Sequence, residues 1–100
     1  MKTVNIGLIG FGTVGKGVFH LLRDNSTIIA ERTGLELKIV RICDLDQSRI
    51  QAECPHIPGT TSWQDIVDDP SVDVVIELIG GIEPARSILI AAMEAGKDVV

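Results

Sequence analysis

The stretch 4–18 constrains this chain more than any other, because it runs from a short apolar segment through a glycine-rich turn into a helical pattern. Gly10, Gly12 and Gly15 have the G-x-G-x-x-G spacing. In this spacing the first glycine makes a tight turn, the second lets a pyrophosphate approach the backbone, and the third lets the helix pack close to its strand. A helix that begins near Thr13 would also offer an anion its free N–H groups and its dipole. Residues 10–15 are therefore predicted to bind a dinucleotide.

The rest of the chain alternates strand patterns with helical patterns, which indicates an α/β fold with a parallel sheet. The predicted strands cover residues 4–9, 35–43, 57–61, 72–79 and 98–100, and the predicted helices cover about 13–23, 27–33, 62–69 and 84–95. We expect a doubly wound parallel sheet of the Rossmann dinucleotide-binding type, with strand order 3-2-1-4-5. A parallel sheet does not normally stop within a strand, so we expect residues 1–100 to be an incomplete N-terminal NAD(P)-binding domain of a longer protein.

Three helix boundaries carry their own signals. Ser26 is predicted to cap the second helix, and Gly34 to end it in a left-handed conformation. Ser62 and Asp65 have the spacing of a capping box, with Asp in place of Glu. These signals predict one helix before the second strand and another after the third strand.

The helical positions also suggest which side chains pack and which face water. Val14, Val18 and Leu22 form an apolar stripe that is expected to lie on the sheet. His20 lies away from this stripe and is predicted to face solvent rather than to act in catalysis. Trp63 is predicted to be a packing residue rather than one that stacks on a ligand.

Composition excludes several classes of function. Hydrophobic residues make up 45% of the chain and charged residues 23%, and no apolar run approaches the ~20 residues of a membrane helix, so we expect a cytoplasmic globular protein without a membrane partner. The net charge of −5 and the scarcity of aromatic residues argue against a nucleic-acid partner. Cys43 is interpreted as core and Cys54 as loop. Cys54 and His56 have no companions that would complete a metal site, so none is predicted.

A carboxylate at the end of the second strand is expected to bind the cofactor's adenosine ribose. The dinucleotide fingerprint places such an acid about 20 residues past the glycines. Glu36 satisfies that spacing but lies at the start of the strand, whereas Asp44 follows the strand and comes later by about the length of the extra helix. We therefore choose Asp44, with a loop-capping aspartate as the alternative. Asp44 favours NAD because it would repel the 2′-phosphate of NADP, whereas Arg49 favours NADP; we expect NAD or NADP, with NAD preferred.

The whole chain resembles the N-terminal cofactor domain of homoserine dehydrogenase. The resemblance is carried by residues 10–18, 73–85 and 95–100, and Glu-Leu-Ile-Gly-Gly followed by Glu-Pro-Ala is its most particular part. It implies interconversion of L-homoserine and L-aspartate 4-semialdehyde with NAD or NADP, in the biosynthesis of threonine, methionine and isoleucine. It also implies a homodimer, with a substrate domain whose catalytic lysines and acidic residues lie beyond residue 100. No catalytic residue is therefore assigned within this chain.

The resemblance extends the predicted cofactor site beyond the three glycines. It implies that Phe11, Thr13 and Val14 join the glycine turn in holding the pyrophosphate, and that residues 79–81 line the nicotinamide side. These last residues are Ile79, Gly80 and Gly81. From the sequence pattern alone, the two glycines either let the backbone approach the cofactor or make a tight turn.

Two other functions remain open at this point. Another small-molecule NAD(P)-dependent dehydrogenase would share the glycine turn but should differ after the fourth strand. A non-catalytic nucleotide-sensing module would share the fold, because fold does not fix function. Sequence beyond residue 100 separates these possibilities, since only an enzyme needs a substrate domain.

Overall fold

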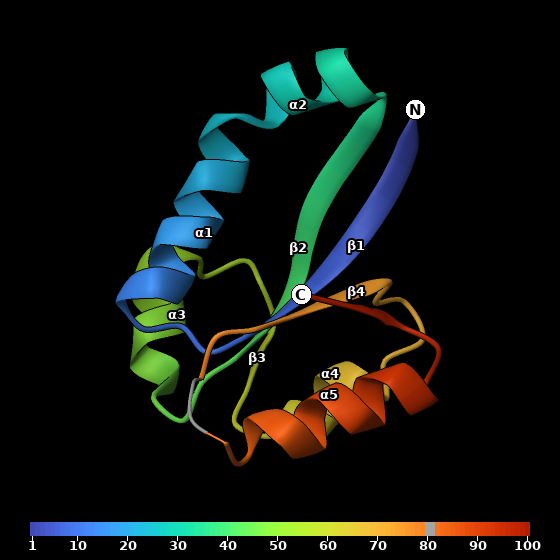
Figure 1. Ribbon diagram of the computed structural model, residues 1–100. Coiled ribbons are helices and arrows are strands. Elements are labelled where there is room, and N and C mark those ends of the chain that lie inside the picture. Colours follow the sequence, from blue (N-terminus) through green and yellow to red (C-terminus); the bar gives the residue numbers. More distant parts are fainter. Residues whose placement is uncertain (80–81) are drawn as a thin grey trace.

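The computed structural model describes residues 1–79 and 82–100, and it is built on one parallel sheet with helices on both faces (Figure 1). The strand order is β3-β2-β1-β4-β5, which confirms the predicted order and fold class. The strands are β1 (Lys2–Ile9), β2 (Leu35–Cys43), β3 (Gly59–Thr60), β4 (Val74–Glu77) and β5 (Asp98–Val99). The helices are α1 (Thr13–Asp24), α2 (Ser26–Thr33), α3 (Gln47–Glu53), α4 (Trp63–Val67) and α5 (Ala85–Glu94).

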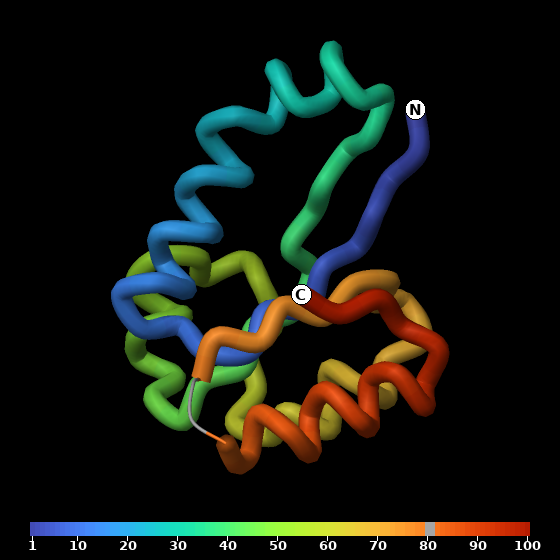
Figure 2. The backbone as a smooth tube through the Cα atoms, in the orientation of Figure 1, coloured from blue at the N-terminus to red at the C-terminus, as the bar shows by residue number. Residues whose placement is uncertain are grey.

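Strand β1 lies at the centre of the sheet because it pairs with β2 on one side and β4 on the other. The trace in Figure 2 shows β1 and β2 side by side far beyond the reach of the other strands. Ile9 is opposite Cys43 of β2 and Glu77 of β4, so all three strands end at the same edge. The chain leaves β1 at this edge directly into the glycine turn. The topology therefore brings the turns after β1, β2 and β4 together.

The two faces of the sheet carry separate apolar clusters. Helices α4 and α5 cover one face with side chains that include Ile66 and Ile88, against Ile9 and Val75 of the sheet. On the other face, Leu8 packs with side chains of the glycine turn, β2 and α3. The members of this second cluster are Leu8, Phe11, Ile42, Ile50 and Cys54. Burial of the second half of β1 toward both clusters explains the apolar run from Ile6 to Ile9.

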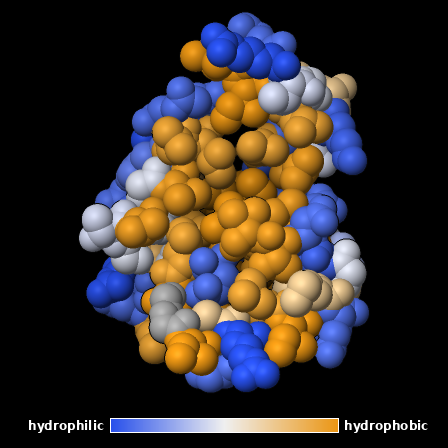
Figure 3. Space-filling model, viewed as in Figure 1, coloured by the Kyte–Doolittle hydropathy of each residue, from blue (hydrophilic) through white to orange (hydrophobic). Residues whose placement is uncertain are grey.

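Part of the predicted packing of α1 is wrong. Of the predicted stripe, Val14 is 63% exposed, whereas Val18 and Leu22 are partly buried, and Gly15 is the only buried residue of this helix. The first turn of α1 lies at the edge where β1 ends, so little of the sheet lies beneath it. Figure 3 shows apolar side chains at the surface over the middle of this face of the molecule.

The structure also corrects several boundaries. Helix α3 replaces a region with no predicted helix, and the predicted strand 72–79 shortens to β4. Ser26 is the first residue of α2, and the N-cap is Asn25. Gly34 ends α2 with φ 73°, as predicted. Pro84 is the N-cap of α5 rather than its first residue.

The expected capping box at α4 does not form. The Ser62 hydroxyl donates to Gln64 Oε1 at 2.7 Å, and Asp65 accepts a hydrogen bond from Thr60 Oγ1 at 2.5 Å. The Ser62 N–H donates to the same Thr60 hydroxyl oxygen at 3.1 Å. Thr60 therefore takes the bonds that a capping box would use.

Within residues 1–79 and 82–100, no helix has the length and hydropathy needed to span a membrane.

Candidate dinucleotide site

A pocket of about 550 Å³ lies at the edge of the sheet where β1, β2 and β4 end. This volume is typical of sites for small molecules, and in α/β sheets such sites lie outside the carboxyl ends of the strands. The pocket is formed by four segments, namely the glycine turn, the end of β2 with the loop and helix α3 that follow it, the residues after β3 and the residues after β4. Its lining comprises Gly10, Phe11, Gly12, Cys43, Asp44, Leu45, Asp46, Arg49, Thr61, Trp63, Leu78, Ile79 and Pro84.

Two of the three motif glycines are required by contacts within the protein. Gly10 has φ +103°, and a Cβ there would lie 3.1 Å from the Leu78 carbonyl carbon and 3.2 Å from the Ile79 nitrogen. A Cβ on Gly15 would overlap the Gly10 carbonyl oxygen. These contacts let α1 lie close to β1 and let the first turn touch the turn after β4.

Gly12 differs from the other two because it borders open space. Its nearest neighbour for a Cβ is the Arg49 guanidinium nitrogen Nη1, at 3.8 Å. Gly12 is also the N-cap of α1, where it provides no capping side chain. The first intrahelical bond runs from the Lys16 N–H to the Gly12 carbonyl oxygen at 2.9 Å. The free N–H groups of the first turn of α1 thus follow directly after a residue that lines the pocket, as in anion sites at helix N-termini.

The other residues expected at this turn differ in whether they border the pocket. Phe11 lines the pocket, but its ring is fully buried and meets Phe19 edge-on, with the ring centroids 6.1 Å apart. Thr13 and Val14 are exposed in the first turn of α1 and do not border the pocket among the described residues. A ligand would therefore meet Phe11 and this first helical turn mainly through backbone groups.

Asp44 directly follows β2, as the sequence predicts, and it lies beside the glycine turn. Its Oδ2 accepts the Phe11 N–H at 2.9 Å, and its Oδ1 accepts the Asp46 N–H at 3.0 Å. The second bond is the loop-capping interaction considered as the alternative. Because a carboxylate offers about four acceptor positions, both bonds leave capacity for hydroxyl donors.

Arg49 adds one positive charge to this rim of the pocket. Its Nη1 lies 3.6 Å from Asp44 Oδ2, and its Nε lies 3.6 Å from Asp46 Oδ2. Hydrogen bonds from Ser48 lower the pKa of Asp46, and the charges of Arg49 and Lys16 act in the same direction. The rim therefore presents two carboxylates and one guanidinium. Sequence reasoning considered Arg49 only as a ligand for phosphate and did not foresee its contact with both carboxylates.

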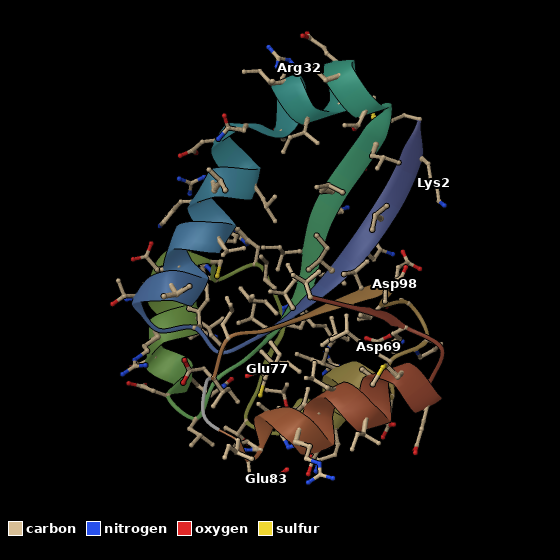
Figure 4. The ribbon with its side chains drawn as sticks, viewed as in Figure 1. Lys2, Arg32, Asp69, Glu77, Glu83 and Asp98 are labelled. Carbon is tan, nitrogen blue, oxygen red and sulfur yellow. The ribbon has the colours of Figure 1, made fainter. Side chains whose placement is uncertain are left out.

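The turn after β4 closes the opposite side of the pocket. The Leu78 N–H donates to the Ile9 carbonyl oxygen at 2.8 Å, and the Ile79 N–H donates to Glu77 Oε1 at 2.6 Å. Glu77 lies at the end of β4 in Figure 4. Ile79 lines the pocket, whereas Gly80 and Gly81 lie outside the described residues.

Three other titratable side chains, those of His20, Cys43 and Cys54, are partly or fully buried in the fold. The His20 Nε2 lies 3.1 Å from Glu53 Oε2, so His20 connects α1 to α3 and is only partly exposed. Cys43 borders the pocket, and burial raises the pKa of its thiol to about 11. Cys54 follows α3 in a loop, as interpreted, but is buried, and burial raises its pKa as well. Both cysteines are free, and the described residues contain no group of three side chains suited to a metal ion.

The parallel sheet, the glycine turn at its switch point and the adjoining carboxylate define a Rossmann-type nucleotide-binding domain. The family model described as "Homoserine dehydrogenase, NAD binding domain" matches residues 10–100. The chain belongs to the homoserine dehydrogenase family.

Individual relatives agree with this assignment. The homoserine dehydrogenase of Neisseria gonorrhoeae is 42% identical over 100 residues, and that of Bacillus subtilis is 39% identical over 102 residues. Each alignment covers 100% of this chain and 23% of the relative, so the chain spans about a quarter of their length.

Solved structures show the same relationship. A homoserine dehydrogenase from Thiobacillus denitrificans matches with a TM-score of 0.91 and 43% identity, over 99% of this chain and 23% of that chain. A levoglucosan dehydrogenase in complex with NADH and L-sorbose matches with a TM-score of 0.82 and 26% identity, over 99% of this chain and 27% of that chain.

Proposed function

We propose that this chain is the cofactor-binding part of an enzyme that interconverts L-homoserine and L-aspartate 4-semialdehyde with NAD or NADP. The match to the NAD-binding domain of homoserine dehydrogenase over residues 10–100 carries the proposal. The reaction would serve the biosynthesis of threonine, methionine and isoleucine in the cytoplasm. The substrate-binding and dimerisation region would lie outside these 100 residues, in a protein that forms a homodimer.

The cofactor is proposed to lie across the pocket with its pyrophosphate at Gly12. The open space at this glycine and the uncapped N-terminus of α1 support this position. The turn would present backbone groups of Gly10, Phe11, Gly12, Thr13, Val14 and Gly15. The nicotinamide would lie along Ile79, Gly80 and Gly81.

Asp44 is proposed to accept hydrogen bonds from the hydroxyls of the adenosine ribose. Its carboxylate is held by two backbone N–H groups, so it needs little reordering when a ribose binds. Two carboxylates against one guanidinium at this rim favour NAD over the dianionic 2′-phosphate of NADP. We expect a preference on the order of tenfold, or about 1–2 kcal/mol.

When bound, the nicotinamide cofactor accepts or supplies the hydride. The residues of this chain would bind and orient it, while the alcohol proton would be handled by groups of the substrate domain, as the family resemblance implies. Gly10 and Gly15 contribute by bringing β1, α1 and the turn after β4 into contact, which shapes the pocket.

The direct test is oxidation of L-homoserine by the complete protein, followed by the absorbance of NADH or NADPH. The expected result is product formation with homoserine and none with levoglucosan, the sugar substrate named for the levoglucosan dehydrogenase. Oxidation of another small alcohol in place of homoserine would favour a different dehydrogenase. Tight binding of the cofactor without oxidation of any alcohol would favour a nucleotide-sensing module.

A further inference from the structure

Trp63 has two structural roles at once. It packs against the apolar cluster beneath α4 and α5, as predicted, and it also borders the pocket. It is the only tryptophan of the chain and the first residue of α4. Because the core holds one part of the indole, the part that borders the pocket presents a fixed aromatic surface.

A hydrogen-bonded framework links Trp63 to the end of β2. The Gln47 side-chain amide donates to the Asp44 carbonyl oxygen at 2.7 Å and to the Thr60 carbonyl oxygen at 2.9 Å. Thr60 Oγ1 accepts the Ser62 N–H at 3.1 Å, directly before Trp63. These bonds hold the wall that contains Trp63 in a defined place relative to Asp44.

The order of the chemical groups along the cofactor indicates which group lies against the wall that contains Trp63. If Asp44 binds the adenosine ribose, the adenine ring is the next group and must extend away from the glycine turn. Besides Asp44, the lining of the pocket includes Leu45, Thr61 and Trp63, which follow the ends of β2 and β3 rather than the glycine turn. These residues offer an apolar surface and an aromatic ring, whereas the pyrophosphate and nicotinamide lie on the other side of the ribose.

We infer that Trp63 forms a wall of the adenine subsite, with its indole against the adenine ring of the dinucleotide. This inference rests on the proposed function, because it takes the position of the ribose from Asp44. An indole suits the role because base stacking on an aromatic side chain needs a planar, weakly polar surface. Trp63 is then a determinant of affinity for the adenosine half of the cofactor.

The test uses the complete protein and three ligands, namely NADH, AMP and NMNH, which lacks the adenosine. Trp63→Leu should weaken NADH and AMP binding roughly tenfold, as expected for loss of one stacked base, and leave NMNH binding unchanged. Trp63→Phe keeps an aromatic ring and should retain affinity within about threefold. AMP should also change the tryptophan emission of the wild type, and this change should be smaller in Trp63→Phe. Met93→Ala, at an exposed position of α5, is the control and should match the wild type.

Three results would overturn the inference. Unchanged AMP affinity in Trp63→Leu would remove Trp63 from the adenine subsite, while NADH binding by the wild type would leave the proposed function intact. Equal losses of AMP and NMNH would show that Trp63 only supports the fold of the pocket. A wild-type protein that binds neither NADH nor AMP would overturn the proposed function, and this inference with it.

Discussion

The Asp44 carboxylate accepts the backbone N–H of Phe11 at 2.9 Å, which joins the end of β2 to the glycine turn after β1. The second carboxylate oxygen accepts the Asp46 N–H, so one side chain shapes two loops. The carboxylate proposed to bind the ribose therefore also supports the backbone of these two loops. Replacing Asp44 will change both the charge of the rim and the support of the turn.

Replacement of Asp44 by alanine should reduce the preference for NAD. The reason is that the carboxylate favours the ribose 2′-OH and disfavours the 2′-phosphate. The measurement is the ratio of kcat/KM for NAD and NADP in the complete enzyme, expected to be about ten in the wild type and near one in Asp44→Ala. Asp46→Ala removes a more exposed carboxylate and should move the ratio less. A wild-type preference for NADP, or a ratio that Asp44→Ala leaves unmoved, would remove Asp44 from the ribose site.

A bulky residue at Gly12 should abolish cofactor binding without unfolding the protein. A Cβ at this position meets no atom closer than 3.8 Å, but a valine side chain would fill the space proposed for the pyrophosphate. Calorimetry with NAD and a thermal melt of the complete protein provide the two readouts. Gly17→Ala, in open space one turn along α1, is the matched control and should leave NAD affinity unchanged. Wild-type affinity in Gly12→Val would defeat this placement of the pyrophosphate.

Alanine at Gly15 should lower the stability of the fold itself. Its Cβ would overlap the Gly10 carbonyl oxygen, so α1 would have to move away from the turn, at a cost of about 1–3 kcal/mol. Gly17→Ala on the same helix should instead raise stability by about 0.5–1 kcal/mol, because it only removes backbone freedom. Urea unfolding of the two variants measures the difference. Similar effects of the two substitutions would contradict the close packing at Gly15.

The stability of the protein should fall as the pH rises from 9 to 11. Burial, followed by the charges of Asp44 and Asp65, raises the pKa of Cys43 from 9.0 to about 11. Below pH 9 the thiol is protonated in both states, and above it only the unfolded state ionises freely. The loss is about 1.4 kcal/mol per pH unit within this window.

Urea unfolding at several pH values would check this loss. Cys43→Ala should reduce the slope without removing it, because burial raises the pKa of Cys54 as well. Equal slopes in the wild type and in Cys43→Ala would refute the assignment to Cys43.

Residues 1–100 alone should not oxidise homoserine, because a dinucleotide-binding domain supplies only the cofactor side of the reaction. The assay is NADH production from homoserine by this chain, with the complete enzyme as the positive control. Measurable turnover by the chain alone would place catalytic groups within these 100 residues.

Local sequence patterns were sufficient for much of the fold. The apolar run of β1, the glycine spacing and the helical periodicity that ends at Gly96 each depend on neighbouring residues, so they could be read directly. The strand order followed from the preferred winding of α/β units. Asp44 could be located because it directly follows a clear strand.

Other features depended on the tertiary structure. Helix α3 has seven residues, of which only Ile50 is buried, and Asp46 caps it. So short a segment with one buried residue shows too little apolar periodicity to predict a helix. The exposure of Val14 depends on where the sheet ends beneath α1, and the contact of Arg49 with two carboxylates depends on the turn that α3 makes. Trp63 reaches the pocket only because β3 lies beside β2, which brings their following loops to one edge. Periodicity reports which face of a segment is apolar, whereas the meeting of distant loops is decided by how the packed elements place their ends.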